Sequence, residues 1–333
     1  MTIRNLLNAA LLGLVGVAGL TGCDVPLQDY YELRGLDPLK GVAYDPGPQV
    51  FYTTSLVGGE IEMVTSLGRQ YLFHRIDDPQ ITLHGAALDA ARRRLWVCAV
   101  DRDDIASPGH GWLLGFDVEE RRLEVRVDLR ELHQGEVTET ACEAVDVADD
   151  GVVYAVDPSQ PVVYRYDPGA NRGSILARDD AFAPTGAGGR GLGGVAVHPG
   201  GEHLIVARTD PPALFVIPLD EPHAAREVSF ADDPLGRPGD PRFPAAGGLT
   251  FVGEDLYVVF LGAVQRVRFT DAEGLRTARV ATTTAVPSGL AMATSADGAA
   301  YALDGDAFKV EVLGQRAEVP FSLVRVDPSV FAD

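Results

Sequence analysis

Short apolar runs alternate with turns rich in Asp, Pro and Gly from about residue 36 to the end of the chain. This alternation is typical of β-strands, and no segment after residue 23 has the period of a long helix. Six of the runs open with a small residue, and they occupy 41–45, 85–89, 144–147, 194–197, 248–251 and 289–292. Their starts are 44, 59, 50, 54 and 41 residues apart, close to the repeat length of a propeller blade. The pattern therefore predicts six repeated units.

Each unit continues with further strand-like runs. Second strands are expected at 50–55, 95–101, 152–157, 203–209, 255–260 and 299–304. Third strands are expected at 60–66, 112–118, 162–167, 213–219, 264–270 and 321–327. Outer strands are expected at 70–76, 123–129, 174–178, 226–230 and 277–283. The last unit lacks an outer strand, and Tyr30 to Leu33 is expected to supply it, which joins the start of the chain to its end and leaves no open sheet edge.

These runs together predict an all-β, six-bladed β-propeller with four-stranded antiparallel blades over residues 36–333. Small residues at the six openings fit this fold, because inner strands crowd around an axis. The Gly- and Pro-rich stretches at 184–194 and 234–248 are interpreted as loops between blades, since strand signals resume after each. A division into two β domains stays open as the alternative.

The N-terminus has the pattern of an export signal. Arg4 precedes the mostly apolar run from Leu6 to Leu20, whose 15 residues are too few for the roughly 20 that a spanning helix needs. Leu20-Thr21-Gly22-Cys23 resembles the lipobox of bacterial lipoproteins, in which the cysteine is acylated and becomes the mature N-terminus. We therefore expect a signal peptide at 1–22 and a lipidated Cys23 that begins a short tether or closing strand at 23–35. The alternative is an ordinary signal peptide with an incidental cysteine.

The net charge and the predicted export signal limit the possible partners. The chain has 28 Lys plus Arg against 48 Asp plus Glu, a net charge of −20, which argues against a basic face for nucleic acid. Lipid on Cys23 would attach the domain to a membrane without embedding it. We expect the protein at the bacterial cell envelope, on the inner or the outer membrane, with the domain outside the cytoplasm. Its expected partners are the membrane and an unidentified small molecule or envelope protein.

Two cysteines remain after Cys23. In an oxidising compartment Cys98 and Cys142 are a candidate disulfide. Two buried free thiols are the alternative.

Residues 142–157, followed by 163–167, resemble a blade of the SMP-30/gluconolactonase/LRE-like family of six-bladed propellers, and so do residues 193–201. In catalytic members of that family a divalent metal, often calcium, lies at the mouth of the central channel. The metal is held by Glu, Asn and Asp and supports hydrolysis of a lactone or ester. The resemblance implies the fold more strongly than it implies the reaction.

The residues that the resemblance assigns to the metal site do not suit a metal. Aligned by blade openings, the three ligand positions fall on Lys40, Gly193 and Gly247, which supply a cation and two residues without side-chain oxygens. A further Asn position falls on Glu143. Asn171 is the only asparagine after residue 22, so no Asn-dependent site can form. The metal site of the family is therefore expected to be lost or rebuilt.

Several polar residues at strand ends are expected near one mouth of the channel. They are Asp101, Asp157, Asp210, Asp304, Glu143 and His84. Glu143, Asp157 and Asp304 are candidates for binding Ca²⁺ or another divalent cation, and Glu143, Asp101 and His84 are candidates for catalysis. The alternative is structural: an Asp at a strand end accepts N–H bonds from the following turn, and a single channel histidine satisfies its neighbours.

Two basic residues and a second histidine complete the candidates. Lys40 and Arg190 could receive an anionic ligand, together with Glu143, Asp101 and Asp157 as polar ligand-binding residues, or they could balance nearby carboxylates. His110, between two glycines, is expected in a loop, either over the mouth or in solvent.

Two functions follow from these residues. The first is a membrane-tethered binding or assembly module that has lost the metal chemistry, and it carries no cofactor. The second is a lactone or ester hydrolase with a rebuilt cation site.

Overall fold

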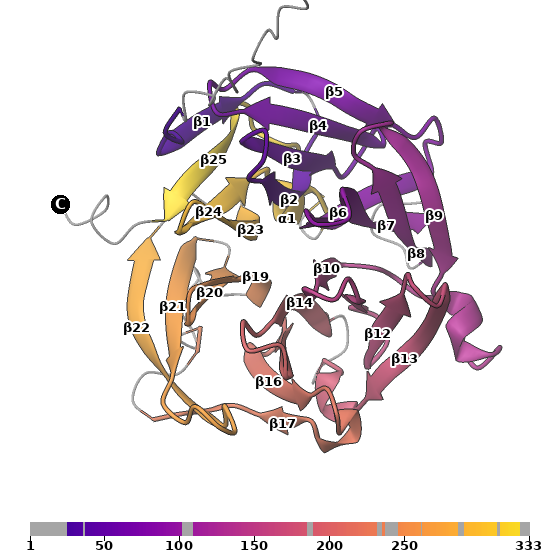
Figure 1. The fold of residues 1–333 in the computed structure, drawn as a ribbon, viewed down its shortest axis with the longest axis vertical. Coiled ribbons are helices and arrows are strands. Elements are labelled where there is room, and N and C mark those ends of the chain that lie inside the picture. Colours follow the sequence, from indigo (N-terminus) through magenta and orange to yellow (C-terminus); the bar gives the residue numbers. More distant parts are fainter. Residues whose placement is uncertain are drawn as a thin grey trace, which may run out of the picture.

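Six blades surround a central axis in the computed structural model (Figure 1). It describes residues 25–35, 37–101, 109–184, 189–231, 235–236, 246–260, 262–285, 290–311 and 314–326. The predicted all-β, six-bladed propeller with mostly four-stranded antiparallel blades is confirmed. The predicted signal peptide and Cys23 lie outside the described residues.

The strands follow the predicted order from the axis outwards. The inner strands are β2 (Leu39–Asp45), β6 (Ile81–Asp89), β10 (Ala144–Val147), β14 (Leu192–Val197), β19 (Ala246–Val252) and β23 (Leu290–Ala296). The second strands are β3 (Val50–Ser55), β7 (Arg94–Asp101), β11 (Val153–Val156), β15 (His203–Arg208), β20 (Asp255–Phe260) and β24 (Ala299–Asp304).

The outer half of each blade completes the sheet. The third strands are β4 (Glu60–Thr65), β8 (His110–Asp117), β12 (Val162–Asp167), β16 (Ala213–Pro218), β21 (Ala263–Phe269) and β25 (Phe321–Val326). The outermost strands are β5 (Gln70–Arg75), β9 (Arg122–Asp128), β13 (Arg172–Arg178), β17 (Arg226–Glu227), β22 (Thr277–Ala285) and β1 (Tyr30–Leu33). The helical segments are η1 (Arg130–His133), η2 (Asp180–Phe182), η3 (Pro222–Ala224) and α1 (Ala307–Glu311).

Glycine at the inner-strand openings allows close contact between neighbouring blades. A Cβ on Gly41 would lie 2.1 Å from the carbonyl oxygen of His84, and one on Gly194 would lie 2.3 Å from that of Gly247. A Cβ on Gly85 would lie 2.8 Å from Cα of Ala144. Because backbone atoms cannot move aside as a flexible side chain can, these positions require glycine, as the crowding argument predicted.

The ring closes where the two ends of the described chain meet. Strand β1 pairs antiparallel with β25, from Tyr30 opposite Val324 to Leu33 opposite Phe321. The adjacent Tyr31 is buried, with its ring 5.6 Å from that of Phe51 in the first blade. The predicted closing strand therefore both completes the sixth blade and packs it against the first.

One predicted outer strand is divided between two blades. Residues 226–230 were expected to form the edge of the fourth blade, but only β17 does so, by pairing with β16. Strand β18 (Ser229–Phe230) instead pairs parallel with β22, so the fifth blade has five strands. Between them, Val228 is buried and donates its N–H to the carbonyl of Leu214. Burial of Val228 between the blades accounts for the crossing.

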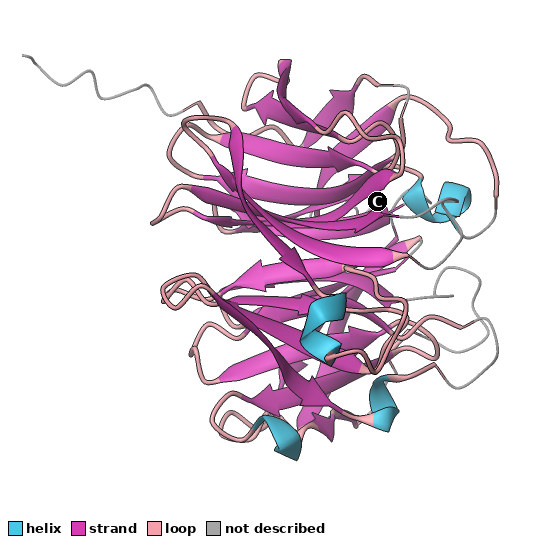
Figure 2. Cartoon of the chain, turned by 90° about the vertical axis from the view of Figure 1, so that its right-hand side faces the viewer, coloured by secondary structure: helices cyan, strands magenta, loops and turns pink. Residues whose placement is uncertain are grey.

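The propeller has two ends, seen from the side in Figure 2. All six inner strands run in one direction along the axis, so their first residues share an end, which we call the entry end. The turns from second to third strands lie at the entry end too. The turns that follow the inner strands and the third strands lie at the other end, which we call the exit end. Among the described residues, no helix is long and apolar enough to cross a membrane.

Candidate functional site

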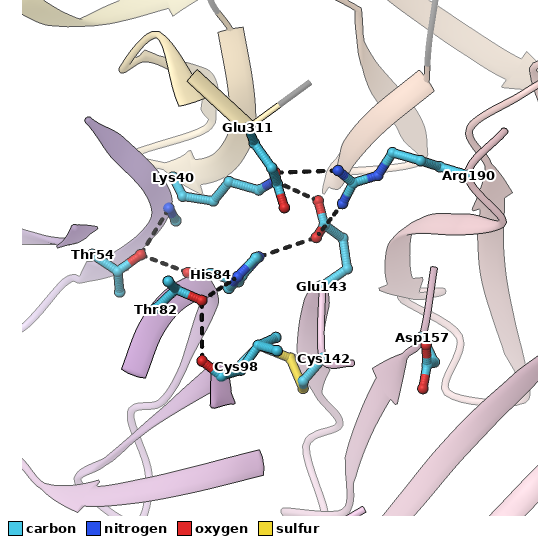
Figure 3. Close-up of polar contacts among 12 residues, drawn as sticks. Lys40, Thr54, Thr82, His84, Cys98, Cys142, Glu143, Asp157, Arg190 and Glu311 are labelled. Carbon is cyan, nitrogen blue, oxygen red and sulfur yellow. Dashed lines mark hydrogen bonds and ion pairs between the residues drawn. A yellow bond between two sulfur atoms is a disulfide. The ribbon is translucent and has the colours of Figure 1, made fainter. Parts of the chain in front are cut away.

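Five charged or titratable side chains converge near the axis at the entry end (Figure 3). Each comes from a different element: β2, β6, the residue before β10, the segment before β14, and the end of α1. We call this group the axial cluster, and it consists of Lys40, His84, Glu143, Arg190 and Glu311. All are buried except Arg190, whose side chain is 26% exposed.

The cluster pairs two cations with two carboxylates. Lys40 Nζ lies 2.7 Å from Glu143 Oε1 and 2.5 Å from Glu311 Oε2. Arg190 also spans both glutamates, with Nη2 2.9 Å from Glu143 Oε2 and Nη1 3.2 Å from Glu311 Oε2. Each cation therefore bridges both carboxylates, and the four groups together have no net formal charge.

His84 adjoins this network as a neutral group. Its Nδ1 lies 3.1 Å from Glu143 Oε2, and its Nε2 lies 3.0 Å from the hydroxyl of Thr82. Burial lowers the pKa of His84 to about 4, although the hydrogen bond and charge of Glu143 oppose this shift. A neutral ring protonated on Nδ1 donates to Glu143, and the Thr82 hydroxyl lies between Nε2 and the carbonyl oxygen of Val100, at 3.1 Å from the latter, with one proton to give to either.

Both glutamates are ionised at neutral pH. Burial acts to raise the pKa of Glu143, but Lys40 and Arg190 overcome it and hold that pKa well below its ordinary value. The same opposition applies to Glu311, where Arg190 and Lys40 outweigh burial and lower the pKa to about 2. The two carboxylates in turn raise the pKa of Arg190 against the opposing effect of its partial burial.

The donor spacing alone could hold a metal. One nitrogen of His84 and one carboxylate oxygen each of Glu143 and Glu311 lie within 4.8 Å of one another. Those carboxylates already bond to the nitrogens of Lys40 and Arg190. A divalent ion would bring a third positive group to the same oxygens. The present arrangement of side chains therefore does not fit a metal unless both cations move away.

The local backbone explains why these residues meet. The hydroxyl of Thr54 accepts the N–H of Gly41 and donates to the carbonyl of His84, so it links the strands that carry Lys40 and His84. In the next blade, the N–H of Gly85 donates to the carbonyl of Glu143. These contacts join three neighbouring inner strands directly beneath the cluster.

A disulfide fixes the segment of Glu143. Cys98 in β7 is bonded to Cys142, with their Cα atoms 4.9 Å apart, and both residues are fully buried. The predicted pairing is thus present, and the alternative of two free thiols is not adopted. Because Cys142 directly precedes Glu143, the bond ties this carboxylate to the second blade.

Asp157 supports the same segment and is not part of the cluster (Figure 3). Its carboxylate accepts N–H bonds from Ala141, Ser159 and Gln160 and hydroxyl bonds from Ser159 and Tyr164. It is fully buried, and burial raises its pKa. The structural alternative therefore describes its contacts, while the bond to Ala141 helps to position Glu143.

Two other predicted aspartates also lie apart from the cluster. Asp304 ends β24, and burial together with the charge of Asp306 raises its pKa to about 6. Asp101 ends β7, where it is paired with Ile81 and His110. Among the described residues, neither aspartate belongs to the group with metal-ligand spacing.

His110 was expected in a loop, and this was wrong. It is the first residue of β8, opposite Asp101, and its Nε2 lies 2.5 Å from Nη1 of Arg130. Strand β8 begins two residues before the start at residue 112 that the sequence predicted. A residue held in the sheet in this way does not act as a movable cover.

Sequence reasoning missed Glu311. The chain between β24 and β25 spans residues 305–320, whereas the equivalent turn of the first blade spans only 56–59. A Cβ on Gly305 would lie 2.0 Å from the carbonyl oxygen of Leu39, and the N–H of Leu39 donates to the carbonyl of Gly305. This contact places α1 beside Lys40. The unusual length of the insertion was the available signal.

No protein-family model matches the chain, and no curated protein sequence matches it. Solved propeller structures do. A gluconolactonase from Xanthomonas campestris is 16% identical, with 89% of this chain and 88% of that chain covered and a TM-score of 0.56. A putative glucose dehydrogenase from Thermus thermophilus is 18% identical, with 89% and 98% covered and a TM-score of 0.59. A luciferin-regenerating enzyme is 10% identical, with 90% and 95% covered and a TM-score of 0.61.

These similarities concern the fold. The chain is a six-bladed propeller that resembles gluconolactonase and luciferin-regenerating enzyme structures at low identity. The three relatives are described by different reactions, so the shared fold does not select one.

Proposed function

We propose that this chain is a non-catalytic propeller that acts as a binding or assembly module, exported and held at a membrane by lipid on Cys23. An internal network of ion pairs takes the axial place that a metal has in the hydrolases it resembles. The observation that carries this proposal is the contact of Lys40 Nζ with both Glu143 and Glu311.

The energetics of the network support the loss of metal binding. A metal that took both carboxylates would leave Lys40, whose side chain is only 7% exposed, without its anions. Leaving a buried charge uncompensated costs about 3–5 kcal/mol. The same metal would also break both contacts of Arg190. Any affinity for a divalent ion is reduced by these losses, whereas the metal-free network is already balanced.

The thermal stability of the purified full chain, measured with calcium, magnesium or zinc and with a chelator, tests this proposal. We expect no change with any ion, and no metal-dependent hydrolysis of gluconolactone or of an activated ester. A bound ion at 100 times its Kd would stabilise the fold by about 2.7 kcal/mol and raise the Tm by several degrees. Such a shift in the unaltered chain, lost in Glu143→Gln, would overturn the proposal.

Lys40→Gln is the matched variant. It removes the cation but retains both carboxylates and His84, so the three metal-donor positions are left with only Arg190 beside them. We expect this variant to gain a metal-dependent rise in Tm that the parent lacks. The variant thereby shows that the assay can detect metal binding at this cluster.

A metal-dependent lactonase or esterase is the second candidate. The spacing of His84, Glu143 and Glu311 favours it, because histidine and glutamate are both common ligands of zinc. It requires Lys40 and Arg190 to move when the ion binds. Metal-dependent stabilisation together with hydrolysis by the unaltered chain would select this candidate.

A further inference from the structure

The segment that precedes β1 is fixed to the exit end of the propeller. Gln28 donates from Nε2 to the carbonyl of Ser66 in the first blade and accepts at its own carbonyl from the hydroxyl of Tyr301 in the sixth. The carbonyl of Asp29 accepts the N–H of Arg325. Leu27 is half-buried and packs against the main core. Two blades therefore hold residues 27–29, which we call the tether root.

The tether root lies opposite the axial cluster. Ser66 follows β4, and Tyr301 is near the start of β24, so both belong to the exit end. A further contact at the same end joins the hydroxyl of Tyr44, near the end of β2, to Asp297 in the turn before β24, at 3.2 Å. By contrast, β24 runs towards α1 and the axial cluster at the entry end. The tether root and Glu311 therefore lie at opposite ends of the propeller, separated by the length of a blade along the axis.

Chain geometry restricts where a lipid on Cys23 can be. Cys23 is four residues before Leu27, and an extended chain spans at most about 3.5 Å per residue, so the two are at most about 14 Å apart. An inner strand such as β2, with seven residues, is about 23 Å long at 3.3 Å per residue. A membrane that holds Cys23 must therefore lie at or beside the exit end, because the tether is too short to reach the entry end.

Exposed apolar side chains are concentrated near the tether root. Four of the large hydrophobic residues of the described chain are between 49% and 58% exposed there, and we call them the exit-end patch: Tyr30, Leu67, Tyr71 and Leu72. Tyr30 follows the tether root, Leu67 follows Ser66, and the hydrogen bonds between Gln70 and the backbone of Arg34 join the start of β5 to the end of β1. Val57 and Val319, also exposed, lie in entry-end segments.

The composition of this region suits a lipid surface. Tyrosine is enriched at membrane interfaces, where its ring contacts the acyl boundary and its hydroxyl contacts the headgroups. Arg34 and Arg69 are exposed beside the patch and can approach lipid phosphates. Two nearby acids are paired, Glu32 with Arg34 and Asp29 with Arg325, which leaves Arg69 as the cation beside the patch that is not used in these pairs. The patch itself is thus close to balanced in charge, whereas other exit-end turns carry exposed acids such as Asp149, Asp150 and Glu254.

We infer that the exit end of the propeller rests on the bilayer surface through the exit-end patch, and that the axial cluster faces away from the membrane. This inference rests on the proposed lipid anchor at Cys23. It adds an orientation: the entry-end loops, and not the exit end, are available to a partner in the aqueous compartment.

The orientation can be tested with the full lipidated chain, because Cys98 and Cys142 are bonded and an introduced cysteine is then the only free thiol. Leu67→Cys and Tyr71→Cys place a fluorescent label at the exit end, and Val57→Cys places it at the entry end as the matched control. Each labelled chain is reconstituted in phosphatidylethanolamine and phosphatidylglycerol vesicles containing a headgroup-linked nitroxide lipid. We expect several-fold stronger quenching at positions 67 and 71 than at position 57.

Equal quenching at the two ends, stronger quenching at position 57, or no quenching at any position would overturn the orientation. Flotation of the chain with the vesicles and the intact mass of its N-terminal peptide measure the anchor separately. A chain that floats and carries lipid but gives such quenching refutes only the orientation. A chain with an unmodified Cys23 that does not float refutes both the anchor and the orientation.

Discussion

Replacing Lys40 by methionine removes the cation from the axial cluster while retaining a side chain of similar length. In the parent chain Lys40 and Arg190 balance Glu143 and Glu311. In the variant, two buried carboxylates share one cation. Breaking a buried ion pair by removing one partner costs about 3–5 kcal/mol, because the remaining charge loses its compensation. We expect Lys40→Met to lower the free energy of unfolding by this amount at neutral pH.

The titration of Glu311 gives the pH dependence of the same network. Burial would raise its pKa, but Arg190 and Lys40 lower it from the ordinary value of 4.5 to about 2. A carboxyl with a lowered folded-state pKa contributes stability above its unfolded pKa and loses it as the pH falls through the folded value. The contribution is therefore complete at neutral pH and is lost between about pH 4.5 and 2. The difference corresponds to about 3 kcal/mol, which the two cations contribute together against the opposing effect of burial.

The variant should respond to pH in the opposite direction. With one cation removed, a carboxyl of the cluster is expected to take up a proton more readily in the folded than in the unfolded chain. Protonation then relieves the repulsion below the unfolded pKa near 4.5, and the relief is lost as the pH rises through the raised folded value. The difference in stability between parent and variant should thus be smaller near pH 4 than near pH 7.

Urea unfolding followed by the fluorescence of Trp96 and Trp112 measures both quantities. Arg268→Met is the control, because Arg268 forms an exposed pair with Asp255 that is expected to contribute little. A loss for Lys40→Met no greater than for this control, or a loss that is the same at acidic and neutral pH, would refute the account of the network.

Three further outcomes follow from the structure. The double variant Cys98→Ala, Cys142→Ala removes a disulfide that closes a loop of 44 residues, and the free energy of unfolding in urea should fall by about 4 kcal/mol. Two titratable thiols at these positions in the denatured, unreduced parent would contradict this. Gly41→Ala should lower the Tm strongly, because its Cβ would lie 2.1 Å from the backbone carbonyl oxygen of His84. Gly35→Ala is the control and should not lower the Tm, because no atom lies within 4 Å of its Cβ position. Equal Tm values for the two variants would be inconsistent with the close approach. His84, with its pKa lowered to about 4, should keep a constant imidazole NMR shift from pH 8 to 5. Because the unfolded chain binds this proton near pH 6.5, the free energy of unfolding should fall as the pH is lowered from about 6.5 to 4. A titration midpoint near pH 6.5 in the folded chain would exclude the buried neutral ring.

The strand order could be predicted from the sequence because each kind of strand in a blade requires a particular pattern of residues. Blade cores need apolar alternation, and inner strands need small residues where neighbouring backbones meet, as at Gly41 and Gly85. The closing strand was predictable because the sixth unit lacked an edge. The division of residues 226–230 was not predictable, since it depends on how deeply one side chain, Val228, is buried between two blades.

The composition of the cluster was only partly predictable. Lys40, Glu143 and Arg190 precede or begin inner strands, and His84 lies in the first half of one, so the repeat itself directs them to the axis. Three of the predicted aspartates lie at the ends of second strands: Asp101, Asp157 and Asp304. A second strand is one strand spacing, about 4.8 Å, further from the axis than an inner strand, and these aspartates are not part of the ion pairs of the cluster. Glu311 depends on a short helix in an insertion, which no strand period can reveal.

The balance of charges in the cluster determines where recognition can occur. Because Lys40 and Arg190 neutralise Glu143 and Glu311, the axis presents neither an excess of anions for a metal nor an excess of cations for an anionic ligand. A partner that approached this point would have to compete with contacts that are already made between buried groups. Under the proposed function, recognition is then expected at the loops around the entry end, of which the structure describes residues 56–59 and 314–320 among others. An anchor at the exit end would turn those loops towards the aqueous compartment, so the proposed anchor and the balanced charges of the axial cluster together favour capture of a partner over chemistry on a substrate.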